Sequence, residues 1–334
     1  MSLQAFWNRK SALNFLLLPI SWLFRAAVAF RRVLYRKGLL ASSHPGVPVI
    51  VVGNLNAGGS GKTPFVVWLV EWLRSQGYCP GVISRGYGRS DTAILCVHSS
   101  SLAAEVGDEP LLIHVKAGVP VAVGANRLDA ARLLLARNPG VDIIVSDDGL
   151  QHYRLRRDLE LVLADANNLF GNGWLLPAGP LREPVSRLSE AGALILTERN
   201  GKAKDLLTGI PVFSVRHEPA GFRNLTNGSH AASLPYVPGR MTEAVSGIAR
   251  PENFFDLLTR LGINHHARAF ADHYHFRPGD LDPDARIVMT EKDAVKCRAF
   301  AGQDWWSLEL KLVPGAGLEV WLKDRLNALD KRHE

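Results

Sequence analysis

A glycine-rich loop places the strongest constraint on this chain. Residues 56–63 read Asn-Ala-Gly-Gly-Ser-Gly-Lys-Thr and lie between an apolar run at 49–52 and a helical pattern at 64–75. A strand that leads into such a loop and a helix that leaves it form the setting in which backbone amides converge on phosphate. Lys62 is then placed to reach the β- and γ-phosphates, and the Thr63 hydroxyl to bind Mg²⁺. The loop therefore predicts a nucleoside triphosphate site in an α/β fold.

Every residue of the loop is a candidate nucleotide ligand. The candidates are Asn56, Ala57, Gly58, Gly59, Ser60, Gly61, Lys62 and Thr63. Asn56 stands where the motif usually has glycine, and asparagine tolerates a left-handed backbone better than most residues. A GTPase of this fold would carry Asn-Lys-x-Asp, whereas Lys292 and Asp293 are adjacent here. ATP is therefore the expected nucleotide.

A second motif supplies the metal side of the expected site. The apolar run at 143–146 ends in Asp147 and Asp148, as in a Walker B strand whose terminal carboxylate holds Mg²⁺. We expect Thr63, Asp147 and Asp148 to surround the metal. The alternative is a solvated Asp-Asp-Gly turn, which the phosphate loop upstream disfavours.

Strand and helix patterns alternate along the rest of the chain. Strands are expected at 49–52, 82–84, 120–124, 141–146, 159–164 and 193–197, and helices at 64–75 and 129–137. Strands that are apolar on both faces and alternate with helices indicate a parallel sheet covered by helices on both sides. A second, smaller α/β unit follows, with strands expected at 244–248, 286–290 and 306–311 and helices at 251–261, 293–299 and 318–329.

The boundaries between these parts follow from composition. Residues 219–239 are rich in Asn, Gly, Ser and Pro and are typical of a linker or hairpin. We expect a basic amphipathic helix in 1–40, a P-loop nucleotide-binding domain in 41–215, a linker or hairpin in 216–240 and a smaller α/β lid domain in 241–334.

The positive charge is concentrated in residues 1–40, which we call the leader. Arg and Lys occur there without any acid, because the first acidic residue is Glu71, and the remaining 32 basic side chains balance the 32 acidic ones. A nucleic-acid binder more often spreads its charge over a domain face, so no nucleic-acid partner is expected. The 3 scattered cysteines favour a reducing compartment. A polytopic membrane protein is excluded because no uninterrupted apolar window of about 18 residues occurs.

The leader itself predicts an amphipathic helix from Trp22 onward. Its apolar face carries Leu23, Ala27, Phe30 and Leu34, and its basic face Arg25, Arg32 and Arg36. Such a helix lies in a membrane interface and is drawn to anionic lipid head groups. Pro19 and Arg25 interrupt the longer apolar run and disfavour a spanning helix. The alternatives are a helix packed on its own domain and, less favoured because Arg25 lies inside the apolar stretch, a signal peptide.

Polar residues in loops after the expected strands are candidates for handling the phosphoryl acceptor. They are Arg85, Tyr87, Asp108, Glu109, Gln151, Arg182, Asp272 and His273. Taken alone, Asp108 is typical of a helix N-cap. His273 lacks further ligands at metal-binding spacing, so a structural histidine is the competing interpretation.

Taken in order, these segments resemble one known family. The set VGNLNAGGSGKTP, SRGYG, GDEP, DDGLQH, PAGPLREP, ADHYHF and TEKDAVKC is similar to the tetraacyldisaccharide 4'-kinases of lipid A biosynthesis, over about residues 1–330. The resemblance implies transfer of the γ-phosphate of ATP to the 4'-hydroxyl of a tetraacylated glucosamine disaccharide 1-phosphate, which gives lipid IVA. It also implies work at the cytoplasmic face of the bacterial inner membrane, peripherally or through a single N-terminal anchor.

The resemblance further implies roles for individual residues. Asp108 matches the base toward the sugar hydroxyl, and His273 the residue that assists it. Lys62 keeps its phosphate-loop role as a catalytic residue. Tyr87, Gln151 and Arg182 match positions near phosphate or nucleotide. Ala271 stands where the family usually has proline, which alters the approach to His273 and not its chemistry. The family also joins its two domains by a two-stranded linker.

Two other functions stay open from the residues alone. One is a P-loop kinase or ligase of another small or lipid substrate, and the other is a membrane-associated nucleotide-switch ATPase. A soluble substrate would require no amphipathic leader, and a switch would hydrolyse ATP without consuming a lipid. An acylated substrate stays in the bilayer, because each buried methylene contributes about 0.8 kcal/mol, so the leader favours a glycolipid and a membrane surface as partners.

Overall fold

The computed structural model describes residues 6–58, 61–89, 91–198, 209–235, 237 and 239–333. Gly59 and Ser60 of the phosphate loop lie outside the described residues. The strands are β1 (Val49–Gly53), β2 (Pro80–Ser84), β3 (Leu95–Cys96), β4 (Val121–Val123), β5 (Ile143–Asp147), β6 (Leu159–Asp165), β7 (Ala193–Glu198), β8 (Val212–Asn224), β9 (His230–Ala231), β10 (Thr242–Ser246), β11 (His265–Ala269), β12 (Arg286–Thr290) and β13 (Trp305–Pro314).

The helices follow the predicted alternation closely. They are α2 (Ala12–Arg36), α3 (Lys62–Ser75), α4 (Ala103–Val106), α5 (Asp108–Ala117), α6 (Arg127–Arg137), α7 (Pro251–Arg260), α8 (Glu291–Cys297) and α9 (Leu318–His333), with short 3-10 turns η1 (Val185–Glu190) and η2 (Arg298–Phe300). The strands form one sheet in the order β11-β10-β12-β13-β8-β7-β6-β1-β5-β2-β4-β3, and β9 pairs with β8.

The central strand β1 shows why the sheet is covered on both sides. Ile50 and Val52 point into one core, which α3, α5 and α9 share, whereas Val49 and Val51 point into the other, which α6 shares. β1 pairs in parallel with β5 and β6. Strands buried on both faces need continuous apolar sequence, which is the pattern that the sequence shows. The predicted parallel α/β sheet is confirmed.

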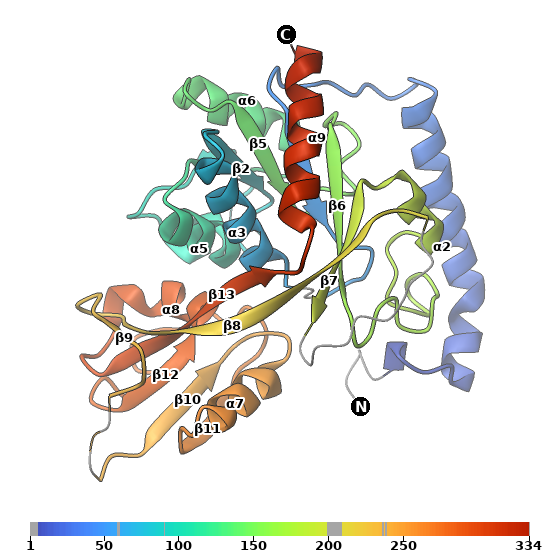
Figure 1. Cartoon of the computed structure of the whole chain (residues 1–334). Helices are drawn as coiled ribbons and strands as arrows, with labels where there is room; N and C mark the ends of the chain where they lie inside the picture. Colours follow the sequence, from blue (N-terminus) through green and yellow to red (C-terminus); the bar gives the residue numbers. More distant parts are fainter. Residues whose placement is uncertain are drawn as a thin grey trace.

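The strand β8 connects two groups of strands. It pairs in parallel with β7 through residues 212–216 and antiparallel with β13 through residues 215–224. Figure 1 shows β8 and β13 running side by side from the group β9–β12 toward α9. Within the expected linker or hairpin at 216–240, β8 and β9 pair antiparallel, and β8 begins before that segment, at Val212. The strands β3 and β11 were not predicted.

The helix α9 departs from the expected domain order. The sequence places it in the 241–334 domain, yet Leu318, Leu322, Leu326 and Leu329 lie in the same core as Ile50. The leucines recur every three or four residues and form one apolar face. After β13 the chain therefore returns to the core that contains Ile50. The local sequence pattern does not reveal this return.

The helix expected from Trp22 onward is present, but it begins earlier than that residue. α2 begins at Ala12 and continues through Pro19. A proline inside a helix removes one backbone hydrogen bond, and the rest of the helix tolerates that loss here. By length and composition α2 could cross a membrane, although signal sequences and buried core helices can meet the same criterion.

The faces of α2 also differ from the expectation. The exposed large apolar side chains are Leu13, Phe15, Leu16, Ile20, Trp22, Leu23, Phe30 and Val33. The basic face turns partly toward the protein, because Arg32 pairs with Glu190 of η1 at 2.5 Å and Arg36 pairs with the same carboxylate. Arg187 and Arg32 hold the pKa of Glu190 below its usual value although its partial burial acts in the opposite direction. Glu190 therefore compensates two charges that were expected to face lipid.

Candidate functional site

The phosphate loop joins the carboxyl end of β1 to the first turn of α3. Gly61 caps α3 with φ 76°, a left-handed conformation that favours glycine. Lys62 Nζ donates to Asn54 Oδ1 at 3.1 Å and lies 3.5 Å from Asp148 Oδ1. Asn54 Nδ2 in turn donates to Gly58 O at 3.0 Å. One amide side chain, which the sequence analysis did not single out, thus holds both the lysine and the loop backbone.

The outer side of the loop is bound to other segments. Asn56 Nδ2 donates to Leu169 O at 2.6 Å, and the Ala57 N–H donates to Pro180 O at 2.7 Å. The left-handed non-glycine residues of the described chain are Asp148, Leu169 and His273. The left-handed tolerance expected of Asn56 is therefore not used. Its side chain fixes the loop instead.

Asp147 ends β5 in a closed environment. It is 1% exposed, its Oδ2 accepts from Ser84 Oγ at 3.1 Å, and its Oδ1 has no hydrogen-bond partner among the described residues. Burial, together with the charges of Glu109 and Asp148, raises the pKa of Asp147 well above its usual value. This buried oxygen is suited to a cation, which would compensate its charge.

Asp148 faces protein cations. Its φ of 48° turns the chain sharply after β5, and its Oδ2 accepts from Arg182 Nη1 at 3.2 Å. Burial alone would raise the pKa of Asp148, but Lys62 and Arg182 outweigh it and lower the pKa. The two adjacent carboxylates therefore have different environments, although nothing in the sequence distinguishes them.

The pair Asp108 and His273 comes together from distant parts of the chain. Asp108 starts α5 and is 5% exposed, and His273 follows β11 with φ 58°. His273 Nδ1 lies 3.2 Å from Asp108 Oδ1, to which it hydrogen-bonds, and 3.0 Å from Oδ2. Burial acts to raise the pKa of Asp108, but the hydrogen bond from His273 and the charge of Lys292 lower it. The hydrogen bond to Asp108 raises the pKa of His273.

Lys292 completes this group and was missed from the sequence. Its Nζ donates to Glu109 Oε1 at 3.0 Å and lies 3.2 Å from His273 Nε2. Burial acts to lower the pKa of Lys292, but Glu109 and Asp108 raise it, so the side chain is a cation. An ammonium can only donate. The Nε2 atom of neutral His273 is therefore the acceptor, and its proton lies on Nδ1, facing Asp108.

Two glycines bring the loops of this group into contact. A Cβ on Gly107 would lie 2.9 Å from Gly86 Cα, and one on Gly86 would lie 2.7 Å from Val106 O. The Ser-Arg-Gly-Tyr-Gly loop and the Gly-Asp-Glu-Pro turn therefore touch backbone to backbone. This approach places the ring of Tyr87 5.1 Å from that of His273, in an edge-on arrangement.

The remaining predicted residues lie around these two groups. Asp272 Oδ1 is 3.9 Å from His273 Nε2. Thr63 and Gln151 are half-buried, and Arg85 is exposed. The negative charge of Glu109 acts on Asp147. The cluster of Asp108, His273 and Lys292 therefore adjoins the residues around the phosphate loop. The structure thus collects the predicted residues at the carboxyl ends of β1, β2 and β5.

Arg127 and His152 are two further polar residues that the sequence analysis left out of the site. Arg127 is 1% exposed, and its guanidinium donates to Gly124 O at 2.7 Å and to Asp147 O at 3.4 Å. Burial lowers the pKa of Arg127 to about 10. Burial and the charge of Arg127 lower the pKa of His152 to about 3. A cation therefore lies beneath Asp147, and His152 is neutral at neutral pH.

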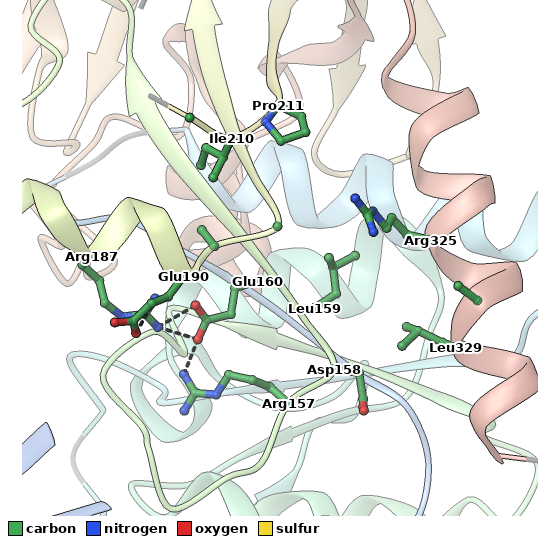
Figure 2. A pocket seen from close by; sticks show the side chains of 14 residues that line it. Arg157, Asp158, Leu159, Glu160, Arg187, Glu190, Ile210, Pro211, Arg325 and Leu329 are labelled. Atoms are coloured by element: carbon green, nitrogen blue, oxygen red, sulfur yellow. Dashed lines mark hydrogen bonds and ion pairs between the residues drawn. The ribbon is translucent and has the colours of Figure 1, made fainter. Parts of the chain in front are cut away.

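A cavity of about 540 Å³ lies at the other end of the sheet, where β6 begins (Figure 2). Its wall contains an ion network in which Arg187 Nη2 lies 2.5 Å from Glu160 Oε2 and Arg157 Nη1 lies 2.9 Å from Glu160 Oε1. Ligands of parallel α/β sheets bind at the carboxyl ends of the strands. The cavity is therefore separate from the phosphate-loop site.

The family is decided by a match over most of the chain. Residues 13–327 match the family described as "Tetraacyldisaccharide-1-P 4'-kinase". The chain belongs to this family. The resemblance drawn from the ordered motifs is therefore confirmed.

Similar proteins agree with this assignment. A tetraacyldisaccharide 4'-kinase of Thiobacillus denitrificans is 51% identical over 98% of this chain and 100% of its own length. That of Azoarcus sp. is 46% identical over 96% of this chain and 94% of its own length. A crystal structure of LpxK from Aquifex aeolicus in complex with ATP matches with a TM-score of 0.81 and 31% identity, over 94% of this chain and 99% of that one. The predicted fold of this kinase family member is thereby confirmed.

Proposed function

We infer that this kinase transfers the γ-phosphate of ATP to the 4'-hydroxyl of tetraacyldisaccharide 1-phosphate and so forms lipid IVA. The observation that carries the inference is that a buried Asp108, paired with the half-buried His273, lies near a phosphate loop. The names of the relatives support the acceptor, and the ATP complex of the Aquifex aeolicus protein supports the donor.

On the phosphate side, Lys62 neutralises charge on the transferred group. Asn54 holds its ammonium at 3.1 Å, so the side chain does not need to be ordered when the nucleotide binds. Asp147 and Thr63 fit a Mg²⁺ ion, because Asp147 Oδ1 is buried without a hydrogen-bond partner in the described chain. Bound there, Mg²⁺ would offset the negative charge of the phosphates. Asp148 instead orients Lys62 and Arg182.

On the acceptor side, Asp108 is the base. As the sugar oxygen bonds to the γ-phosphorus, the bond from that phosphorus to the β,γ-bridging oxygen breaks and ADP leaves. The O–H bond of the sugar also breaks, and its proton passes to Asp108 Oδ2, which has no hydrogen-bond partner among the described residues. His273 donates from Nδ1 to Oδ1 at 3.2 Å and fixes the carboxylate. Asp108 belongs to the expected 41–215 domain, and His273 and Lys292 to the expected 241–334 lid. We therefore propose that closure of the lid assembles the base.

We expect Lys292→Met to move the acid limb of the kcat/KM profile to higher pH. A protonated His273 lowers the basicity of Asp108, so activity falls as the pH drops through the pKa of His273. The charge of Lys292 lowers that pKa, and its loss lets the pKa rise further. Rates between about pH 5 and 9 would show the shift.

Lys292→Arg, which keeps the charge, is the matched control for this profile. It should retain the wild-type midpoint even if the rate changes. Coinciding midpoints for the methionine and wild-type enzymes would disprove the tautomer and the coupling inferred for His273.

We also propose that the enzyme works at the cytoplasmic face of the bacterial inner membrane, with α2 as a peripheral or single anchor. Leu16 and Leu23 are 74% and 73% exposed on its outer face. Leucines this exposed are expected to insert among lipid chains, where each contributes about 1.5–3 kcal/mol. An acylated substrate would then meet the site at the membrane.

Leu16→Asp together with Leu23→Asp should reduce binding to anionic vesicles at least about tenfold and leave ATP affinity unchanged. Co-flotation with vesicles measures the first effect and nucleotide titration the second. Leu102→Asp is the control, because Leu102 is also exposed, at 54%, but lies outside α2. Equal flotation of the double variant and the control would rule out α2 as the anchor.

Labelled ATP incubated with the enzyme and a total lipid extract tests the proposed reaction. Label in a bisphosphorylated glycolipid is the expected result. Label in a water-soluble product would favour another acceptor, and release of phosphate alone would favour a nucleotide-switch ATPase. Either of these outcomes would overturn the proposal.

A further inference from the structure

The two fully buried residues of α2 are both polar, whereas an ordinary surface helix buries apolar side chains. Asn14 and Ser21 lie two turns apart on one face and are 0% and 3% exposed. Both bond to residues 175–182, a segment that we call the strap. The lipid-facing role proposed for α2 uses only its apolar side and leaves these contacts unexplained.

Three hydrogen bonds join α2 to one edge of the strap. Ser21 Oγ donates to Leu175 O at 3.0 Å and accepts from the Ala178 N–H at 3.0 Å. Asn14 Nδ2 donates to Ala178 O at 2.9 Å. Ala178 is 0% exposed, so loss of Ser21 leaves the Ala178 N–H buried and without its partner. Loss of Asn14 is milder, because Ala178 O also accepts from Asn172 Nδ2 at 2.9 Å.

The other edge of the strap bonds to the phosphate loop. Pro180 O accepts from the Ala57 N–H at 2.7 Å, and the Arg182 N–H donates to Leu55 O at 2.7 Å. Arg182 Nη1 donates to Asp148 Oδ2 at 3.2 Å. The strap is therefore the outer wall of the loop that holds Lys62.

The strap is too tightly packed to separate these two edges. The Gly179 N–H donates to Leu175 O at 2.9 Å. A Cβ on Gly179 would lie 2.2 Å from Asn172 Oδ1 and 2.3 Å from Trp174 O. A packed segment of this kind moves as a unit, so displacement of one edge displaces the other.

We propose that Asn14 and Ser21 are positioning residues for phosphoryl transfer, which hold Arg182 and the phosphate loop in their nucleotide-binding arrangement through the strap. The membrane-facing helix then sets the affinity for ATP as well as the location of the enzyme. The proposal rests on the proposed function for the transfer step, whereas its first readout, ATP affinity, needs no lipid acceptor.

The decisive experiment titrates a fluorescent ATP analogue into the full chain in detergent micelles. Ser21→Ala should weaken binding about tenfold, within the roughly 5- to 150-fold range typical of coupling between sites. Asn14→Ala should weaken it less, because Ala178 O retains its bond from Asn172. In the transfer assay, the KM for ATP should rise while the KM for the glycolipid stays constant. A purely structural role would lower the active fraction and leave both KM values unchanged.

Matched variants separate the two faces of α2. Ser21→Thr retains a hydroxyl and should restore the affinity. Leu16→Ala, on the outer face, should leave the analogue bound as in the wild type. Wild-type affinity in Ser21→Ala and Asn14→Ala would overturn the proposal. A chain that binds the analogue normally but forms no lipid product would refute the proposed reaction and leave this result intact.

Hydrogen exchange on the unmodified chain covers the case in which the alanine variants fail to fold. The amides of Ala57, Ala178 and Arg182 donate to Pro180 O, Ser21 Oγ and Leu55 O. Added analogue should slow the exchange of all three together. Protection of Ala57 with unchanged exchange at Ala178 would also overturn the proposal.

Discussion

Lys62→Ala should lower phosphoryl transfer by about a thousandfold or more. The ammonium lies 3.1 Å from Asn54 Oδ1 and 3.5 Å from Asp148 Oδ1 and is only 11% exposed. A charge held in place and shielded from water stabilises the charge of the transferred group far more than a mobile surface lysine would. The initial rate of lipid phosphorylation at saturating ATP measures the loss.

Two comparisons make the Lys62 result specific. Lys323→Ala removes an exposed lysine of α9 and should retain full activity. Lys62→Arg keeps the charge and should recover part of the rate. Transfer at the wild-type rate by a well-folded Lys62→Ala enzyme would refute the phosphate-loop assignment.

Asp108→Asn should lower kcat by about 10²- to 10⁴-fold, the usual contribution of a positioned base, and change ATP affinity little. The amide keeps the shape of the side chain and its bond to His273 but cannot take up the proton of the sugar hydroxyl. The pKa of Asp108 is held below its usual value, so the wild-type carboxylate is ionised across the neutral range. Steady-state kinetics in both substrates separates kcat from the KM for ATP.

Glu105→Gln is the control for Asp108→Asn. Glu105 is a nearby exposed acid whose Oε2 accepts from the Leu102 N–H at 3.1 Å, a bond that glutamine can retain. It should show normal kcat. If Asp108→Asn instead abolished ATP binding, Asp108 would be a metal-site or structural residue, and the base would have to be sought elsewhere.

The cluster of Asp108, His273 and Lys292 could be predicted only in part from the sequence. Asp108 and His273 are 165 residues apart, and Lys292 and Glu109 are 183 apart. The ordered motifs paired the first two only through a family resemblance, since spacing alone favoured an N-cap and a structural histidine. Lys292 was weighed only as a guanine contact, although it lies in the first turn of α8, directly after β12. Other site residues also follow the carboxyl ends of their strands.

The amino-acid sequence by itself determined the parallel sheet, the phosphate loop and the acidic end of β5, because these features follow from local periods and from residue types at short spacing. Only the tertiary structure decided that α9 packs on the first core, that Arg32 and Arg36 turn to Glu190, and that Asn14 and Ser21 face inward. It also decided that Asp148 pairs with Lys62 and Arg182, whereas Asp147 keeps a buried oxygen with no hydrogen-bond partner among the described residues. A helix or turn presents the same side chains whatever it packs against, so which of them are paired and buried depends on neighbours that fold in from distant parts of the chain.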